Sequence, residues 1–60
     1  MNQQTLRIVA EFLLETAMDD LKMAHYFESK GDHEVAELYR QQSSRHMATF
    51  EEFSRQLVEG

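Results

Sequence analysis

Apolar residues recur along this chain three and four positions apart, and a turn-forming segment near the middle divides the pattern into two. Such spacing places the apolar side chains on one side of a helix. The other positions are rich in Ala, Glu, Gln and Arg, and the chain contains no proline. The pattern therefore predicts two long helices, at about residues 3–30 and 33–58, with Asn2 or Thr5 capping the first.

The turn-forming segment is SKGDHE. Lys30 near the end of the first helix complements the helix dipole, and Gly31 suits the left-handed conformation that commonly ends a helix. Asp32 is a typical N-cap for the following helix, with Glu34 in its first turn. A tight turn at residues 31–32 follows, and it folds the two helices back on each other.

The fold class is therefore all-α, an antiparallel two-helix hairpin that makes one domain over residues 1–60. Each helix carries an apolar seam that faces the other, and folding at the turn sets Tyr39 opposite Ala24. The seam of the first helix comprises Ala10, Leu14, Ala17, Leu21 and Ala24, and that of the second comprises Ala36, Tyr39, Ser43, His46, Phe50, Phe53 and Leu57.

A second, weaker apolar row lies beside each seam and would stay exposed in a lone hairpin. A chain of 60 residues also buries only a small core, and it has no cysteine for a disulfide. We therefore expect self-association of two hairpins into a four-helix bundle, the alternative being a monomer with scattered apolar surface residues. The residues expected in this contact are Ile8, Phe12, Met23, Tyr26 and Met47.

The polar segment RQQSSRHM interrupts the apolar seam of the second helix. In the hairpin, Ser43 and His46 come level with Asp20 on the first helix. We expect these three side chains to form a polar core layer, with Asp20 bonded to His46 or to Ser43, within one chain or between two. A polar group that finds its partner only in the correct register disfavours wrongly paired bundles.

A metal site is the alternative interpretation of this layer. The run MDDLKMAHYFESKGDHEVAELYRQQSSRHMATF resembles a helical pair of the ferritin-like and rubrerythrin group, in which one helix supplies a carboxylate and the next a Glu-x-x-His motif. His46 stands at the histidine position and Ser43 at the glutamate position, and Asp19 or Asp20 would supply the carboxylate. The metal ligands implied are Asp20 and His46.

A serine in a straight helix lacks an oxyanion hole, so we expect no catalytic residues and no enzymatic activity. We likewise expect no cofactor, and no metal as the preferred interpretation. With 11 acidic and 6 basic residues the net charge is −5, which argues against nucleic-acid binding and favours a basic protein partner. The chain shows no transmembrane run and no signal-peptide pattern, so we expect a cytoplasmic protein without membrane contact.

The predicted architecture is similar to the Rop family of acidic helical hairpins, which dimerise and bind paired RNA hairpins. The chain as a whole resembles the small acidic early-region proteins of lambdoid phages, through its size, its composition and its start, MNQQTLRIVAEFLLETA. That resemblance implies a phage or host regulatory factor as partner. The function expected is self-association and binding of a protein partner, with a metal-binding bundle or an RNA-binding dimer as the alternatives.

Overall fold

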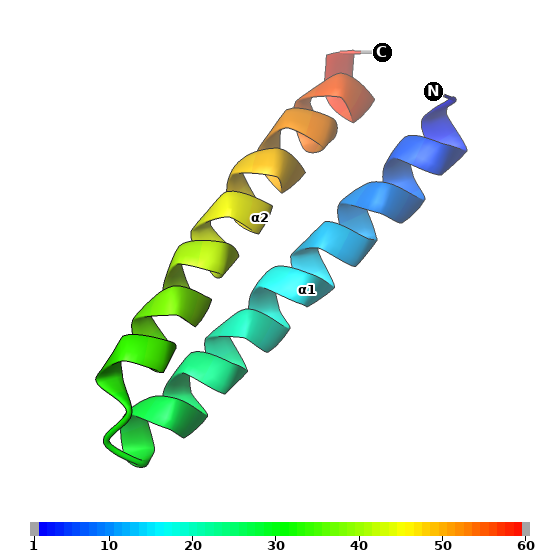
Figure 1. The fold of residues 1–60 in the computed structure, drawn as a ribbon. Coiled ribbons are helices and arrows are strands. Elements are labelled where there is room, and N and C mark those ends of the chain that lie inside the picture. The colour runs from blue at the N-terminus through cyan, green and yellow to red at the C-terminus, as the bar shows by residue number, and fades with distance from the viewer. Residues whose placement is uncertain (1, 60) are drawn as a thin grey trace.

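The computed structural model describes residues 2–59, apart from the side chain of Glu59, and consists of two antiparallel helices joined by a tight turn (Figure 1). Helix α1 spans Gln3–Ser29 and helix α2 spans His33–Glu59. The start of α1 and the end of α2 lie at the same end of the hairpin. The Cα atoms extend over 44 × 14 × 13 Å. The predicted all-helical hairpin is confirmed.

Both ends of α1 are capped by residues close in the sequence. Asn2 is the N-cap, because its side-chain oxygen accepts a hydrogen bond of 2.8 Å from the backbone N–H of Thr5. At the other end Lys30 is the C-cap, so it lies just beyond the helix instead of within its last turn as expected. Gly31 follows with a φ of 79°, the left-handed conformation that glycine adopts without steric cost.

The turn satisfies backbone carbonyl groups at the end of α1. The N–H of Gly31 donates to the carbonyl of Glu28 at 3.0 Å, and the N–H of Asp32 donates to that of Phe27 at 2.9 Å. This pair of bonds is the Schellman motif. The Asp32 carboxylate then accepts from the N–H of Val35 at 3.4 Å, so the residue that completes one helix end also caps the next.

The helices meet along a strip of small residues. The buried apolar residues are Leu6, Ala10, Ala17, Ala24 and Ala36, and the buried Ser43 continues the strip on α2. Leu21, which the seam pattern placed among them, is 45% exposed. Small side chains let the helix backbones approach closely, so larger residues at the margins of the strip are covered on one side only. The core of the single hairpin is therefore mostly alanine.

The register between the helices differs slightly from the expected one. Tyr39 stacks on Phe27, with ring centroids 5.7 Å apart, instead of lying opposite Ala24. Side chains tilt toward the N-terminus of their own helix, so those of α2 lean toward the turn and those of α1 lean away from it. In a side-chain contact between the helices, the two residue numbers therefore add up to about three more than they do for residues whose backbones are level.

Neither helix, over the part of the chain that is described, combines the length and the apolar character needed to cross a membrane.

Candidate functional site

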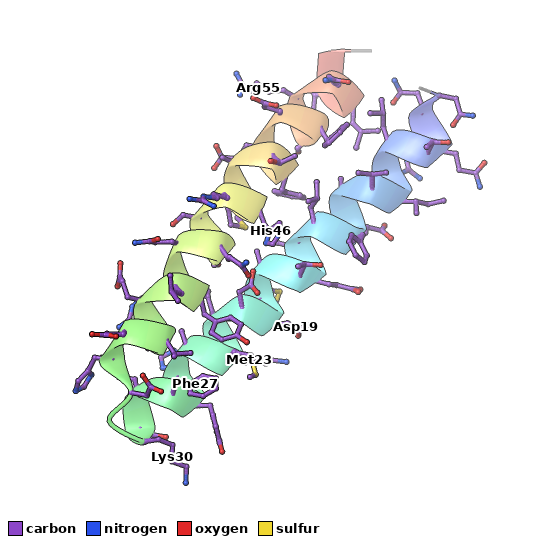
Figure 2. All side chains as sticks on the ribbon, viewed as in Figure 1. Asp19, Met23, Phe27, Lys30, His46 and Arg55 are labelled. Carbon is purple, nitrogen blue, oxygen red and sulfur yellow. The ribbon has the colours of Figure 1, made fainter. Side chains whose placement is uncertain are left out.

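Asp20 and His46 join the two helices at the middle of the hairpin. The Nδ1 atom of His46 lies 2.8 Å from Oδ2 of Asp20, so the imidazole N–H donates to the carboxylate. Asp20 is only 8% exposed, whereas His46 is half-buried. Figure 2 shows His46 directed from α2 toward α1. The polar layer thus closes within one chain.

Ser43 belongs to the same layer but takes a different partner. Its hydroxyl donates to the backbone carbonyl of Ala17 at 3.0 Å, in a buried position, and not to Asp20. The contact is possible because Ala17, in the strip of small residues, leaves the backbone of α1 open to the facing helix. Among the described residues, no buried side-chain nitrogen or oxygen lacks a hydrogen-bond partner. The layer is therefore satisfied, as stable buried polar groups require.

The geometry also bears on the catalytic and metal interpretations. Because the Ser43 hydroxyl donates to a carbonyl, it is not paired with His46 as a nucleophile with its base would be. Asp20 and His46 offer two potential metal ligands that already bond each other. Within residues 2–59 no group of three or more His, Cys, Asp or Glu side chains is placed to hold a metal ion. What the layer does chemically is to join α1 and α2 through hydrogen bonds.

The hairpin has two margins, one on each side of the small-residue strip. Asp20 bonds His46 and Phe27 stacks on Tyr39, so the heptad rows through these residues face each other; we call this margin the His46 edge. On the other margin, the Arg40 edge, Glu28 bonds Arg40 at 3.2 Å. Leu21, Ala24, His25, Glu28 and Arg40 together line one hollow there.

The residues expected to mediate self-association are divided between these edges. On α1, Met23 lies one turn before Phe27, and Figure 2 shows Asp19, Met23 and Phe27 in one row along the helix. Phe12 and Tyr26 lie on the same side of α1 but point farther away from α2, and Ile8 lies farther still around the helix. All of these side chains are exposed. Met47 is half-buried and follows Arg40 by seven residues, which places it on the Arg40 edge. The hairpin therefore does not bring Met47 together with the row on α1.

Leu38 on α2 was missed in the sequence pattern. It is 60% exposed, and it directly precedes Tyr39 as Tyr26 directly precedes Phe27. Because Phe27 and Tyr39 stack, Tyr26 and Leu38 occupy equivalent outward positions beside the His46 edge. The sequence contains a pattern that could have identified Leu38, because two large apolar residues are adjacent along the chain in each helix, Tyr26-Phe27 and Leu38-Tyr39.

A charged cluster beside the turn was also missed. The Glu28 carboxylate contacts both His33 and Arg40 of α2. The hydrogen bond from His33, followed by the charges of His33 and Arg40, holds the pKa of Glu28 below its ordinary value of 4.5. These residues are exposed or half-buried. The sequence could have indicated this cluster, because Glu28 and Arg40 carry opposite charges on either side of the predicted turn.

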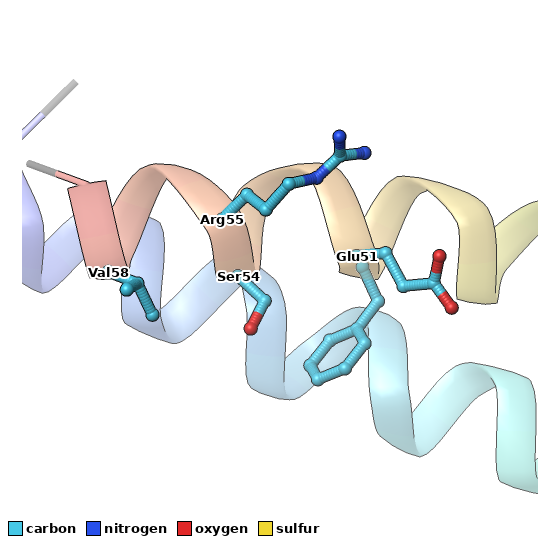
Figure 3. A pocket seen from close by; sticks show the side chains of 5 residues that line it. Glu51, Ser54, Arg55 and Val58 are labelled. Atoms are coloured by element: carbon cyan, nitrogen blue, oxygen red, sulfur yellow. The ribbon is translucent and has the colours of Figure 1, made fainter.

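A shallow hollow of about 400 Å³ lies on the last turns of α2. It is lined by Phe50, Glu51, Ser54, Arg55 and Val58, all from this one helix. Figure 3 shows Ser54 and Val58 on one side of α2 and Arg55 extending away from it. Val58 is 85% exposed. Because α1 contributes none of these lining residues, the hollow is a surface feature of α2.

Comparisons of the chain with protein-family models, with curated proteins and with solved structures found no match.

Proposed function

We propose that this chain is a non-enzymatic helical protein that self-associates into a four-helix bundle and acts by binding another protein. The observation that carries the proposal is the contrast between its core and its surface. Apart from Leu6, the buried apolar residues of the described chain are all alanine, whereas Phe12, Tyr26 and Leu38 are 66%, 54% and 60% exposed. Burial of large apolar side chains is the main source of folding free energy, and here much of that surface faces solvent.

The shape of the hairpin supports the same proposal. Its accessible surface is 4610 Å², compared with about 4,100 Å² for a compact monomer of this mass. Its radius of gyration is 13.7 Å, compared with about 10 Å for a compact domain of 60 residues. Packing two hairpins side by side would cover apolar surface that one hairpin exposes.

The remaining surface supports the binding of a basic protein. The net charge is −5, and acidic residues are spread over the exposed sides of both helices, among them Glu11, Glu15, Glu34 and Glu52. Charge of one sign raises the rate of encounter with a partner of the opposite sign. The polar layer would contribute specificity for one bundle arrangement, because its hydrogen bonds form only in one register.

Sedimentation equilibrium at micromolar concentration tests the self-association. We expect a mass of twice 7.1 kDa, the mass of one chain. A mass near 7.1 kDa with full helicity by circular dichroism would contradict the proposal.

A pair of variants locates the contact. Phe12→Asp should abolish the dimer and much of the helix signal together, because association and folding are linked. Val58→Asp introduces the same charge at another exposed apolar residue, away from the row on α1, and should leave the dimer intact. Equal effects of the two substitutions would count against a specific contact through Phe12.

A further inference from the structure

The Arg40 edge continues outward onto a side of α1 that is apolar at its centre and polar at both ends. Leu21, His25 and Glu28 of α1 line one hollow there together with Arg40 of α2. Two heptad rows of α1 run through these residues. We call the two rows together the Leu21 surface; one row is Arg7, Leu14, Leu21 and Glu28, and the other is Glu11, Met18 and His25.

The centre of the Leu21 surface is open to solvent in the single hairpin. Met18 is 52% exposed and Leu21 is 45% exposed, and Leu14 beside them is half-buried. The ends of both rows carry charged or titratable side chains. An apolar centre with a polar rim is the usual layout of a protein interface.

The order of residues in each row is complementary to its own reverse. When the first row meets an antiparallel copy of itself, basic Arg7 faces acidic Glu28, and leucine faces leucine between them. In the second row Glu11 faces His25, and Met18 faces Met18 of the copy. A two-fold contact uses the same patch on both copies, so it requires a patch that matches itself in this way.

Side-chain tilt lets all of these pairs form in one register. The midpoint of α1, Gln3–Ser29, is Thr16, so residues whose numbers add up to 32 are level when α1 packs antiparallel on a second α1 centred on it. The tilt raises the sum for contacting side chains by three, to about 35. The pairs that come within one of this sum are Arg7 with Glu28, Leu14 with Leu21, Glu11 with His25, and Met18 with itself.

Helix α2 opposes no like charges in this arrangement. It packs on α2 of the other copy about its own midpoint, His46, so its contacting residue numbers add up to about 95. Half-buried Met47 then lies beside Met47 of the other copy, and Ser44 lies beside Glu51 of the other copy. The complementarity of α1 is therefore not offset by repulsion on α2.

We propose that the Leu21 surface is a second self-contact, through which two of the proposed four-helix bundles associate, with α1 antiparallel to α1 of the neighbouring copy. This inference rests on the proposed self-association, whose contact lies on the opposite side of the hairpin, at Phe12. Each bundle carries two Leu21 surfaces that face away from each other. The association therefore continues from bundle to bundle and forms a row.

This second contact is weaker than the contact within the bundle. Its apolar centre is small, and the charged pairs at its ends lie at exposed positions, where ion pairs contribute little. Each chain also has a net charge of −5, so neighbouring bundles repel each other. We therefore expect the bundles to associate between roughly 0.1 and 1 mM, well above the micromolar range in which the bundle itself forms.

Sedimentation over a range of concentrations tests the contact. The weight-average mass should be twice 7.1 kDa at about 10 µM and should rise without a plateau toward about 1 mM. Met18→Arg places two like charges on the two-fold axis and should hold the mass at twice 7.1 kDa over the whole range. Met18→Leu keeps the position apolar and should associate as the wild type does. Circular dichroism checks that both variants keep the helices, as expected for a residue that is 52% exposed.

The two parts of this experiment separate the two proposed contacts. A wild-type mass of twice 7.1 kDa at every concentration overturns this inference and leaves the contact at Phe12 standing. A mass near 7.1 kDa at the lowest concentration contradicts the proposed bundle, and this inference with it. A rise in mass that Met18→Arg leaves unchanged overturns the assignment of the second contact to the Leu21 surface.

Exchange of one pair tests the antiparallel register. Glu11→Lys and His25→Glu should each lower the association constant between bundles by roughly twofold to fivefold, because each disrupts a pair that the symmetry forms twice. The double variant should return the constant to within roughly twofold of the wild-type value. Glu15→Lys and Gln41→Glu make the same changes of charge at exposed positions outside the contact and are the matched controls. Single effects that simply add in the double variant would overturn the pairing of Glu11 with His25.

Discussion

The two ends of the hairpin are held together by different forces. At the closed end, the Schellman motif, the Asp32 cap, the Phe27 and Tyr39 stack and the Glu28 cluster combine within a few residues of the turn. Toward the open end, Leu6 is the one large buried apolar residue in the described chain. In the described part of the chain, the polar contacts between α1 and α2 involve no residue of α1 before Ala17 and none of α2 after His46.

This difference shows where local sequence suffices and where it does not. The closed end is stabilised by residues that are near one another along the chain, so little loop-closure entropy is lost in bringing them together. The open end depends on half-buried apolar side chains such as Leu13, Phe50 and Phe53. Two helices cover such side chains incompletely, so in the proposed four-helix bundle the open half gains most from the second copy.

Leu6→Ala tests the open end and should have the largest effect. The substitution removes the one large buried side chain there, and we expect a loss of about 2–3 kcal/mol in the free energy of unfolding. Urea denaturation followed by circular dichroism, at fixed protein concentration, measures it. Val58→Ala removes apolar atoms from an exposed residue at the same end and should change the free energy by less than about 0.5 kcal/mol. Similar losses for the two variants would mean that Leu6 is not a core residue.

Asp20→Ala tests the boundary between the two halves. Removing the carboxylate that accepts from His46 should cost about 1.5 kcal/mol, less than the loss of Leu6 because half-buried His46 can bond water instead. Glu15→Ala, which removes an exposed carboxylate from α1, is the control. A double-mutant cycle with His46→Ala isolates the pair itself. A coupling energy indistinguishable from zero would show that the contact does not stabilise the hairpin.

Gly31→Ala tests the closed end. With a φ of 79° and no atom within 4 Å of an added Cβ, the cost is conformational and not steric. We expect a loss of about 1 kcal/mol, again measured by urea denaturation. Gly31→Asn should cost less, because asparagine adopts the left-handed conformation more readily than alanine. If alanine were tolerated as well as glycine, the turn would not require the conformation seen here.

The Glu28 cluster should have the smallest effect, and the effect should depend on pH. Because its pKa is lowered in the folded protein, Glu28 contributes stability above its ordinary value of 4.5, and this is lost as the pH falls through the folded value. Thermal unfolding of the wild-type protein and of Glu28→Gln, from pH 6 to about pH 2, should therefore show a difference that vanishes at the acid end. A difference that persists unchanged at the lowest pH would show that the charge of Glu28 is not its source.

Several features of the site follow from the positions of residues along the sequence. The turn at Gly31 and the spacing of the seams were enough to bring Asp20, Ser43 and His46 into one layer. The individual bonds were not predictable in the same way. Ser43 bonds the carbonyl of Ala17 because α1 presents its backbone there, and the side-chain tilt of antiparallel helices sets His46 on Asp20.

The sequence by itself determined the two helices and the turn between them, because capping, glycine conformation and helix propensity act over a few neighbouring residues. Only the tertiary structure established which margin of α1 meets which margin of α2. The apolar period of a helix is the same on both sides of its seam, so it does not specify how far the helix rotates about its axis. That rotation separates Met47 from Met23 and places Leu38 and Tyr26 on the same side of the hairpin.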